Sequence, residues 1–184
     1  VEIAGRDISG SRVNEETGSS NEIIIDNSSN VTGNIDNQAS ITGAAIGISI
    51  DNATVSGDVT NSGTISGSNT AIKLVTTSDM NGGLTNTGTI SGSTAGIVLD
   101  NSDMSGGIDN SGTINANSIG IGVDNGSDMT STITNSCTIS AAAGAHIAVQ
   151  SASGIAGSTD GTVAHITTAA GTISGSIGVT VTAH

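Results

Sequence analysis

The stretch NSGTISGS at 61–68 decides the fold class, because it recurs along the chain with little change. It returns as NTGTISGS at 86–93, as NSGTINAN at 110–117 and as NSCTISAA at 135–142. The isoleucines of this motif, with one more upstream, lie 24, 25, 24 and 25 residues apart: Ile41, Ile65, Ile90, Ile114 and Ile139. A fixed period of this length is typical of a solenoid repeat.

Further apolar positions keep the same period. They form four columns: Ile23, Ile48, Ile72, Ile97 and Ile121; Ile25, Ile50, Leu74, Leu99 and Val123; Val31, Val55, Met80, Met104 and Met129; Ile35, Val59, Leu84, Ile108 and Ile133. Short segments with period-two alternation surround these residues, and no segment has the pattern of a helix. The sequence therefore predicts an all-β fold, a right-handed parallel β-helix (β-solenoid) with 24–25 residues and about three strands per coil.

The chain divides into three parts. Residues 1–22 hold all four Glu and both Arg, which predicts a distinct N-terminal cap or docking segment. Residues 23–141 are the regular coils. Residues 142–184 are irregular, since the next motif isoleucine, Ile173, lies 34 residues after Ile139. We expect an insertion near 158–162, and the spacing places Ala169 at the asparagine position of the motif.

The motif asparagines are predicted to stack inside the solenoid. Side chains at alternate positions of a strand face the same way, so Ile35, Asn37, Ala39 and Ile41 are expected to point inward together. Carboxamides stacked in this way can bond along the axis as a structural ladder of Asn37, Asn61, Asn86, Asn110 and Asn135. The alternative is that these asparagines only form turns. The next column, expected at a tight inward corner where Gly also permits positive φ, is Ala39, Gly63, Gly88, Gly112 and Cys137.

The composition restricts the core and the partners. The chain has no aromatic residue and no Pro, so its core must be built from aliphatic side chains and Met. With 16 acidic and 3 basic residues the formal net charge is -13, which argues against nucleic acid and against anionic membrane surfaces as partners. No apolar run approaches 18 residues, so we expect no membrane insertion. The single cysteine forbids an internal disulfide.

No arrangement of residues indicates catalysis, and we predict that the protein is not an enzyme. His146, His165 and His184 are scattered in the irregular part and lack zinc-site spacing. A polysaccharide-degrading β-helix enzyme remains an alternative, but after residue 22 the chain has one base, Lys73, to stabilise a charged transition state. Every Asp in the coils also recurs with the repeat, whereas an active site is needed once.

Two repeated surfaces suggest other ligands. Asp79, Asp103 and Asp128 form one acidic column; Asp26, Asp51, Asp100 and Asp124 form a second, in which we expect Thr76 to be the interruption. Calcium between coils would relieve their repulsion, so the first column is a weak calcium candidate and no other cofactor is expected. The alternative is that these are solvated turn residues. Hydroxyls flank the motif isoleucines and could form an ice-binding face, which Asn115 interrupts.

The iterated NSGTISGS together with GIVLDN at 96–101 resembles the passenger repeats of bacterial autotransporters and related large surface adhesins. The resemblance covers about residues 23–141 and lies in the style of the repeat. It implies export and a role at the cell exterior as a stalk, adhesin or matrix component. The chain lacks a translocator barrel, an aromatic-rich C-terminal folding core and a protease motif.

The sequence thus predicts a non-enzymatic structural protein, extracellular or at the bacterial cell surface. The motif TISGS and the run Ile177–Val181 continue almost to the last residue without Pro, helix or aromatic plug. Such an uncapped solenoid can stack head to tail on a second copy and grow into a filament. The alternative is a monomeric adhesin that binds host or matrix glycans.

Overall fold

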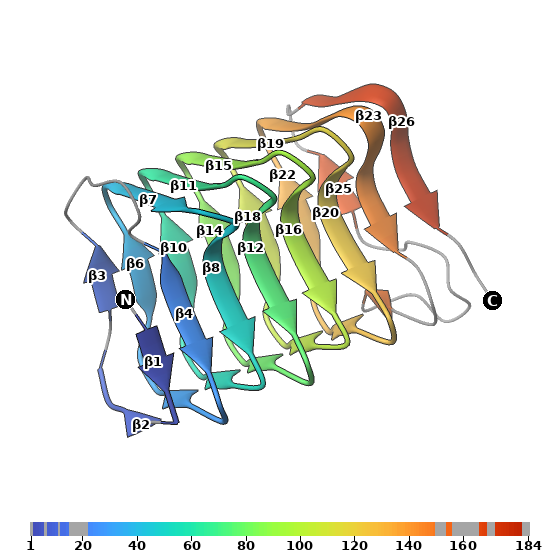
Figure 1. Ribbon diagram of the computed structural model, residues 1–184. Helices are drawn as coiled ribbons and strands as arrows, with labels where there is room; N and C mark the ends of the chain where they lie inside the picture. The colour runs from blue at the N-terminus through green and yellow to red at the C-terminus, as the bar shows by residue number, and fades with distance from the viewer. Residues whose placement is uncertain are drawn as a thin grey trace.

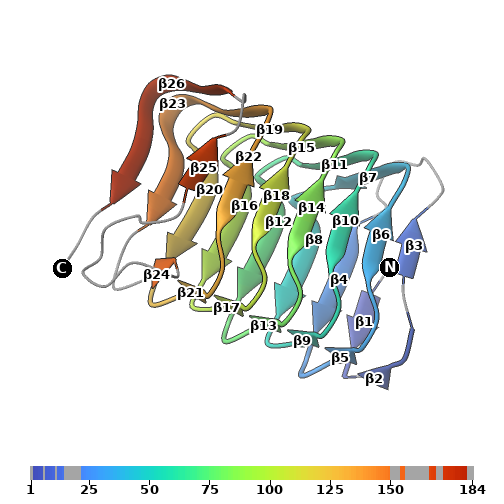
Figure 2. The same cartoon turned by 180° about the vertical axis from the view of Figure 1, so that it is seen from behind.

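The computed structural model describes residues 2–5, 7–10, 12–14, 22–149, 154–155, 166–168 and 172–181. The chain winds as a right-handed β-solenoid whose coils follow one another along a single axis (Figures 1 and 2). Every strand pair between coils is parallel, and the described residues form strands and turns without a helix. The predicted fold class is therefore confirmed. The described residues include no helix that could cross a membrane.

Each regular coil contributes strands to four rows. Row 1 contains β1 (Glu2–Ala4), β4 (Ile23–Asp26), β8 (Ile46–Asp51), β12 (Thr70–Val75), β16 (Ala95–Asp100) and β20 (Ile119–Asp124). Row 2 contains β2 (Asp7–Ile8), β5 (Asn30–Val31), β9 (Thr54–Val55), β13 (Asp79–Met80), β17 (Asp103–Met104), β21 (Asp128–Met129) and β24 (Gly154–Ile155). Row 3 contains β3 (Arg12–Asn14), β6 (Ile35–Asn37), β10 (Val59–Asn61), β14 (Leu84–Asn86), β18 (Ile108–Asn110), β22 (Ile133–Asn135) and β25 (Ile166–Thr168). Row 4 contains β7 (Ser40–Gly43), β11 (Thr64–Gly67), β15 (Thr89–Gly92) and β19 (Thr113–Ala116).

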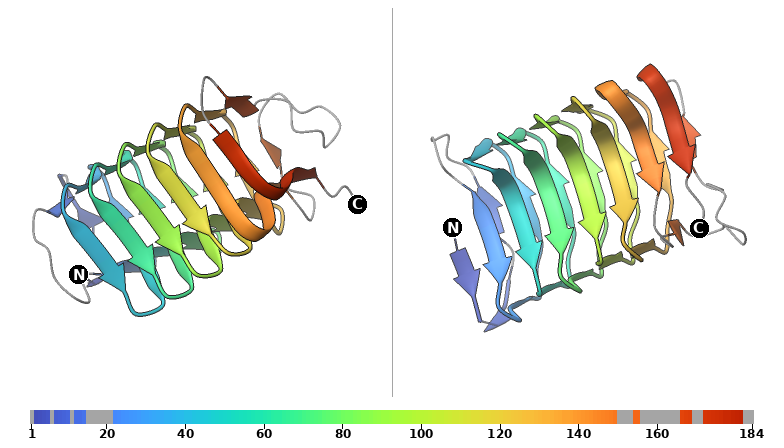
Figure 3. Two further views of the ribbon diagram at one scale, coloured as in Figure 1. Left: turned by 90° about the horizontal axis from the view of Figure 1, so that it is seen from above. Right: turned by 45° about the vertical axis from the view of Figure 1, so that its right-hand side comes forward.

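The four rows form three hydrogen-bonded sheets. Rows 2 and 3 are separate seven-stranded sheets, whereas rows 4 and 1 belong to one twelve-stranded sheet. They are joined by β23 (Thr138–Val149), one long strand that pairs with β19 and then with β20. The last strand, β26 (Thr172–Val181), follows β23 through the same bend (Figure 3). A coil thus has three sheet faces but four short strands, because the chain bends sharply between rows 4 and 1.

The register reproduces the predicted columns. We number coils 1 to 5 by the first buried isoleucine of each: Ile23, Ile48, Ile72, Ile97 and Ile121. Strands β1 to β3 pair in register on coil 1 and place Asn14 opposite Asn37, a continuation of the asparagine column that the repeat did not reveal. The role of residues 1–22 as a cap or docking segment stays a prediction.

At the other end the register corrects one assignment. Ile139 pairs with Ile173, as the motif predicts, but Asn135 pairs with Thr168 rather than with Ala169. The spacing within the motif therefore changes in the last coil, because β25 ends one residue before the expected position. The expected insertion near 158–162 lies outside the described residues.

The core is one continuous cluster of apolar side chains that runs along the axis of the solenoid. The large apolar side chains of the five predicted columns are between 0% and 7% exposed, and they are Ile, Val, Leu and Met. Because equivalent residues lie directly above one another, each side chain packs against its own kind in the neighbouring coils. The interior is narrow enough to be filled without an aromatic ring, which accounts for the absence of Phe, Tyr and Trp.

The alternation between 24 and 25 residues arises in one place, the turn from row 1 to row 2, which we call the first turn. In coils 1, 3 and 5 this turn has two residues with positive φ: Asn27 and Ser28, Thr76 and Thr77, Asn125 and Gly126. In coils 2 and 4 it has one, Asn52 or Asn101. Asn and Gly adopt this left-handed conformation at low cost, whereas a β-branched residue does so at a substantial cost. Long and short turns therefore alternate along one edge of the rod.

The column of small residues does not face the core as expected. Ala39, Gly63, Gly88 and Cys137 are half-exposed, whereas Gly112 is buried, and the glycines of this column do not have positive φ. A Cβ on Gly63 would lie 1.8 Å from the carbonyl oxygen of Ala39 in the preceding coil, and one on Gly88 would lie 2.0 Å from that of Gly63. Glycine is needed here because successive coils approach closely at the bend between rows 3 and 4, and not because of a left-handed backbone.

Candidate functional site

The asparagine ladder is the most regular polar feature of the interior. Its five side chains are between 0% and 2% exposed. The Nδ2 of each donates to the Oδ1 of the next at 2.7 Å, in four successive bonds that join Asn37, Asn61, Asn86, Asn110 and Asn135. The predicted ladder is confirmed, and the reading of these asparagines as turn formers alone is wrong.

The second N–H of each amide ties the ladder to the backbone. Asn61 Nδ2 lies 3.3 Å from the carbonyl oxygen of Gly63 in its own coil and 3.1 Å from that of Thr89 in the next. The same pair of acceptors recurs at Asn86 and Asn110. The amide thus adds hydrogen bonds to carbonyl groups at the bend between rows 3 and 4, where backbone bonds such as Thr89 N–H to the Gly63 oxygen also join the coils. Its role is structural, because every donor and acceptor is used within the fold.

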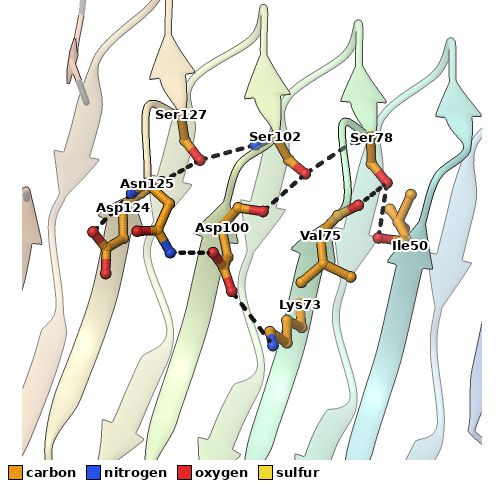
Figure 4. Close-up of polar contacts among 9 residues, drawn as sticks. All are labelled: Ile50, Lys73, Val75, Ser78, Asp100, Ser102, Asp124, Asn125 and Ser127. Carbon is orange, nitrogen blue, oxygen red and sulfur yellow. Dashed lines mark hydrogen bonds and ion pairs between the residues drawn. The ribbon is translucent and has the colours of Figure 1, made fainter. Parts of the chain in front are cut away.

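A second axial column, of serines, was missed in the sequence. It occupies the position before row 2, where Ser29, Ser78, Ser102 and Ser127 are 0–3% exposed. The backbone N–H of Ser78 donates to Ser102 Oγ at 3.1 Å, and that of Ser102 donates to Ser127 Oγ at 2.9 Å (Figure 4). The signal was a recurrence of Ser at the coil period, obscured by Ala53, which takes this place in coil 2.

These serines also close the first turn. Ser127 Oγ donates to the carbonyl oxygen of Asp124 at 2.6 Å, and Ser78 Oγ donates to that of Val75 at 2.6 Å (Figure 4). Each hydroxyl therefore satisfies a carbonyl at the end of a row 1 strand and, through its oxygen, an N–H of the preceding coil. The serine column stabilises the first-turn edge as the asparagine ladder stabilises the opposite bend.

The second acidic column, that of Asp26, Asp51, Asp100 and Asp124, lies along the same edge, and the structure corrects its interruption. Asp51 pairs with Val75, and Val75 with Asp100, so Val75 breaks the column and Thr76 does not. The extra residue of the long turn in coil 3 explains the misplacement. Lys73 Nζ lies 3.7 Å from Asp100 Oδ2, and Asn125 Nδ2 donates to Asp100 Oδ1 at 2.5 Å, so one carboxylate links coils 3, 4 and 5 (Figure 4).

The calcium candidates Asp79, Asp103 and Asp128 lie in row 2 with exposed side chains. Asp79 pairs with Asp103, and Asp103 Oδ1 accepts the backbone N–H of Asp128 at 2.9 Å. One oxygen of the column is therefore already engaged by the backbone. Among the residues that the structure describes, no group of three or more His, Cys, Asp or Glu side chains is placed to hold a metal ion.

The remaining candidates for chemistry are the three histidines and the single cysteine. His146 belongs to β23, whereas His165 and His184 lie outside the described residues. Cys137 is a half-exposed free thiol in the small-residue column. Its Thr138 neighbour bonds to the preceding coil at 3.3 Å, compared with 2.8–2.9 Å in coils 2 to 4, because the larger side chain occupies a glycine position.

The hydroxyls beside the motif isoleucines are mostly half-buried in row 4 and partly bonded to one another. Ser66 Oγ lies 3.4 Å from Thr42 Oγ1, and Ser140 Oγ donates to Asn115 Oδ1 at 2.6 Å. Asn115 thus continues the hydrogen bonding where it replaces a hydroxyl. The suggestion of an ice-binding face stays a prediction.

Comparison with protein-family models, with characterised proteins and with solved structures found no match for this chain. The solenoid geometry is therefore the basis for a proposed function.

Proposed function

We propose that the protein is a non-enzymatic structural protein of the cell exterior, a β-solenoid rod that serves as a self-stacking surface filament subunit or as an adhesin stalk. The observation that favours a mechanical role is the use of the interior polar groups. The asparagine column bonds along the axis at each level from coil 1 to coil 5, and the serine column does so from coil 2 to coil 5. A repeat of this kind resists separation of coils at every point along the rod.

Stacking is supported by the way the rows end within the described residues. The row 1 edge is formed by β1 at one end and by β26 at the other, and each pairs with a single described neighbour. In β26 the residues Ile177, Val179 and Val181 alternate, and Val179 and Val181 continue the columns of Ile147 and Val149. Unpaired strand edges that extend apolar columns add further parallel strands readily. A second copy of the chain would supply them in register.

Negative-stain electron microscopy of the purified chain tests the filament. Fibres of constant width are expected, and they should shorten to single rods in a Val179→Lys variant, since a charge in the apolar column opposes stacking. Val98→Lys is the matched control, because Val98 is half-exposed on the outer face of row 1. Discrete rods from the unmodified chain at every concentration would refute stacking, and the adhesin stalk would then be the remaining proposal.

A further inference from the structure

The alternation of turn lengths produces a notch on the first-turn edge. The long turns of coils 1 and 3 extend on either side of the short turn of coil 2, and a hollow of about 330 Å³ lies between them. Ser28 and Thr77 form its two rims, and the segment Asn52–Thr54 forms its floor. This volume is near the lower limit of small-molecule sites in proteins.

Residues that depart from the repeat are concentrated here. Ala53 replaces the serine of the other coils, which removes a hydroxyl from the floor. Thr54 and Asn30 are neutral where coils 3 to 5 have the Asp of the first acidic column, and Val75 replaces the Asp of the second acidic column. Since a structural role requires the same residue in every coil, a local group of exceptions indicates a role that is needed once.

The backbone of the rim is strained in the same place. Thr76 and Thr77 have φ of 57° and 58°, a conformation that the corresponding turns give to Asn27 and Ser28 and to Asn125 and Gly126. β-Branched residues adopt it at a cost, and such strain is concentrated at ligand sites and switches. Thr77 lines the notch. The chain therefore keeps a methyl and a hydroxyl group at a position where Asn, Ser or Gly would be more stable.

The lining of the notch is mostly polar and neutral. Two buried side-chain oxygens in the described part of the chain have no hydrogen-bond partner: Asp26 Oδ1, at the end of β4 and outside the lining, and Asn30 Oδ1, at the start of β5. Asn30 lines the notch. The hydroxyls of Thr54 and Ser56, also in the lining, make no hydrogen bond within the described residues. They can donate or accept.

We propose that the notch binds one unit of a neutral, hydroxyl-rich carbohydrate. Sugar hydroxyls match the hydroxyl and amide groups of the lining, which can donate or accept. The lining contains no charged residue, while the net charge of -13 repels anionic sugars. Because the chain has no aromatic ring on which a sugar could stack, we expect a Kd of about 1–10 mM for a single unit. The proposal does not depend on whether the rod forms filaments.

The test is an amide chemical-shift titration of the 184-residue chain with the methyl glycosides of glucose, galactose, mannose and N-acetylglucosamine, with glucuronate as the anionic comparison. At least one neutral glycoside is expected to shift the amides of residues 28–30, 52–56 and 77. Ser56→Trp, which fills the notch from its exposed edge, should weaken binding about tenfold. Ser105→Trp is the matched control, because Ser105 is the exposed equivalent in coil 4, and it should bind as the unmodified chain does.

A second variant separates ligand contact from damage to the fold. Thr77→Gly removes a rim side chain and relieves its strain, so binding should weaken while the resistance to urea increases. The proposal is overturned if no neutral glycoside shifts the notch amides at about 100 mM, which is far above the expected Kd. It is also overturned if glucuronate binds as well as the neutral sugars, or if Ser56→Trp and Ser105→Trp have equal affinity.

Discussion

An aspartate in the middle of the asparagine ladder should destabilise the protein in a pH-dependent way. Asn86 is 0% exposed; it donates to Asn110 Oδ1 at 2.7 Å and accepts from Asn61 Nδ2 at 2.7 Å. Asn86→Asp keeps the shape and the acceptor but replaces the donating nitrogen with an oxygen. The new carboxylate then faces the oxygen of Asn110, and the contacts of Nδ2 with the carbonyl oxygens of Gly88 and Thr113 are lost as well.

The magnitude follows from the state of the new carboxyl group. When it is protonated it can restore one hydrogen bond, so the cost is about 1–2 kcal/mol for the donor that is lost. When it is ionised, a buried charge lacks a cationic partner and the cost rises to about 3–5 kcal/mol. Burial raises the folded-state pKa above the unfolded value of about 3.9. The variant is therefore least destabilised below about pH 4 and loses further stability as the pH rises through the folded-state pKa.

Urea unfolding followed by far-ultraviolet circular dichroism at several pH values measures this difference. The matched control is Asn81→Asp, since Asn81 is exposed and the substitution adds the same charge. At pH 7 the ladder variant should unfold at least about 1 M urea below the control, given a slope of about 1–3 kcal/mol per M. Equal midpoints, or a difference that does not change with pH, would refute the role of the ladder as a buried, neutral hydrogen-bonded column.

Three further substitutions test other parts of the fold. Thr76→Asn with Thr77→Gly should raise the free energy of unfolding by about 1–2 kcal/mol, because Asn and Gly tolerate the left-handed conformation of this turn, whereas β-branched residues do not. No gain in the urea midpoint would contradict the positive φ of this turn. Gly88→Ala should lower the free energy of unfolding by more than about 2 kcal/mol, since its Cβ would lie 2.0 Å from a carbonyl oxygen of the preceding coil. A loss below about 0.5 kcal/mol in urea unfolding, the size of an ordinary surface substitution, would refute the close approach. Lys73→Ala should change the free energy of unfolding by less than about 1 kcal/mol, because its ion pair with Asp100 is half-exposed. A larger loss in thermal unfolding would show that this ion pair contributes more than its geometry indicates.

The success of the sequence analysis came from repetition, and its errors came from local exceptions. A column such as Ile35, Val59 and Leu84 could be found because every coil contributes an apolar residue at one spacing. The serine column was missed because Ala53 interrupts it, and Val75 was overlooked because the turn after it has one residue more than the turn of the preceding coil. A spacing counted along the chain cannot reveal in which turn an extra residue is accommodated.

The notch was still harder to predict from spacing along the chain. Its residues, among them Asn30, Ala53 and Thr77, belong to three coils and were each unremarkable in the sequence. They form a notch only because two long turns extend beside a short one. The signals that could have indicated it are the exceptions themselves, since Ala53, Thr54 and Thr76 each replace a residue that other coils repeat.

The sequence by itself determined the solenoid, its coil length and its inner asparagine ladder. Identical residues repeated at one period can all satisfy the same environment only if each coil stacks in register on the previous one, so the pattern leaves a single architecture. The tertiary structure alone decided the number of strands in a coil, the turn that absorbs the alternating residue, the close approach at Gly63 and Gly88, and the notch on the first-turn edge. These depend on backbone dihedral angles and on distances between coils, which the order of residues along one coil does not specify.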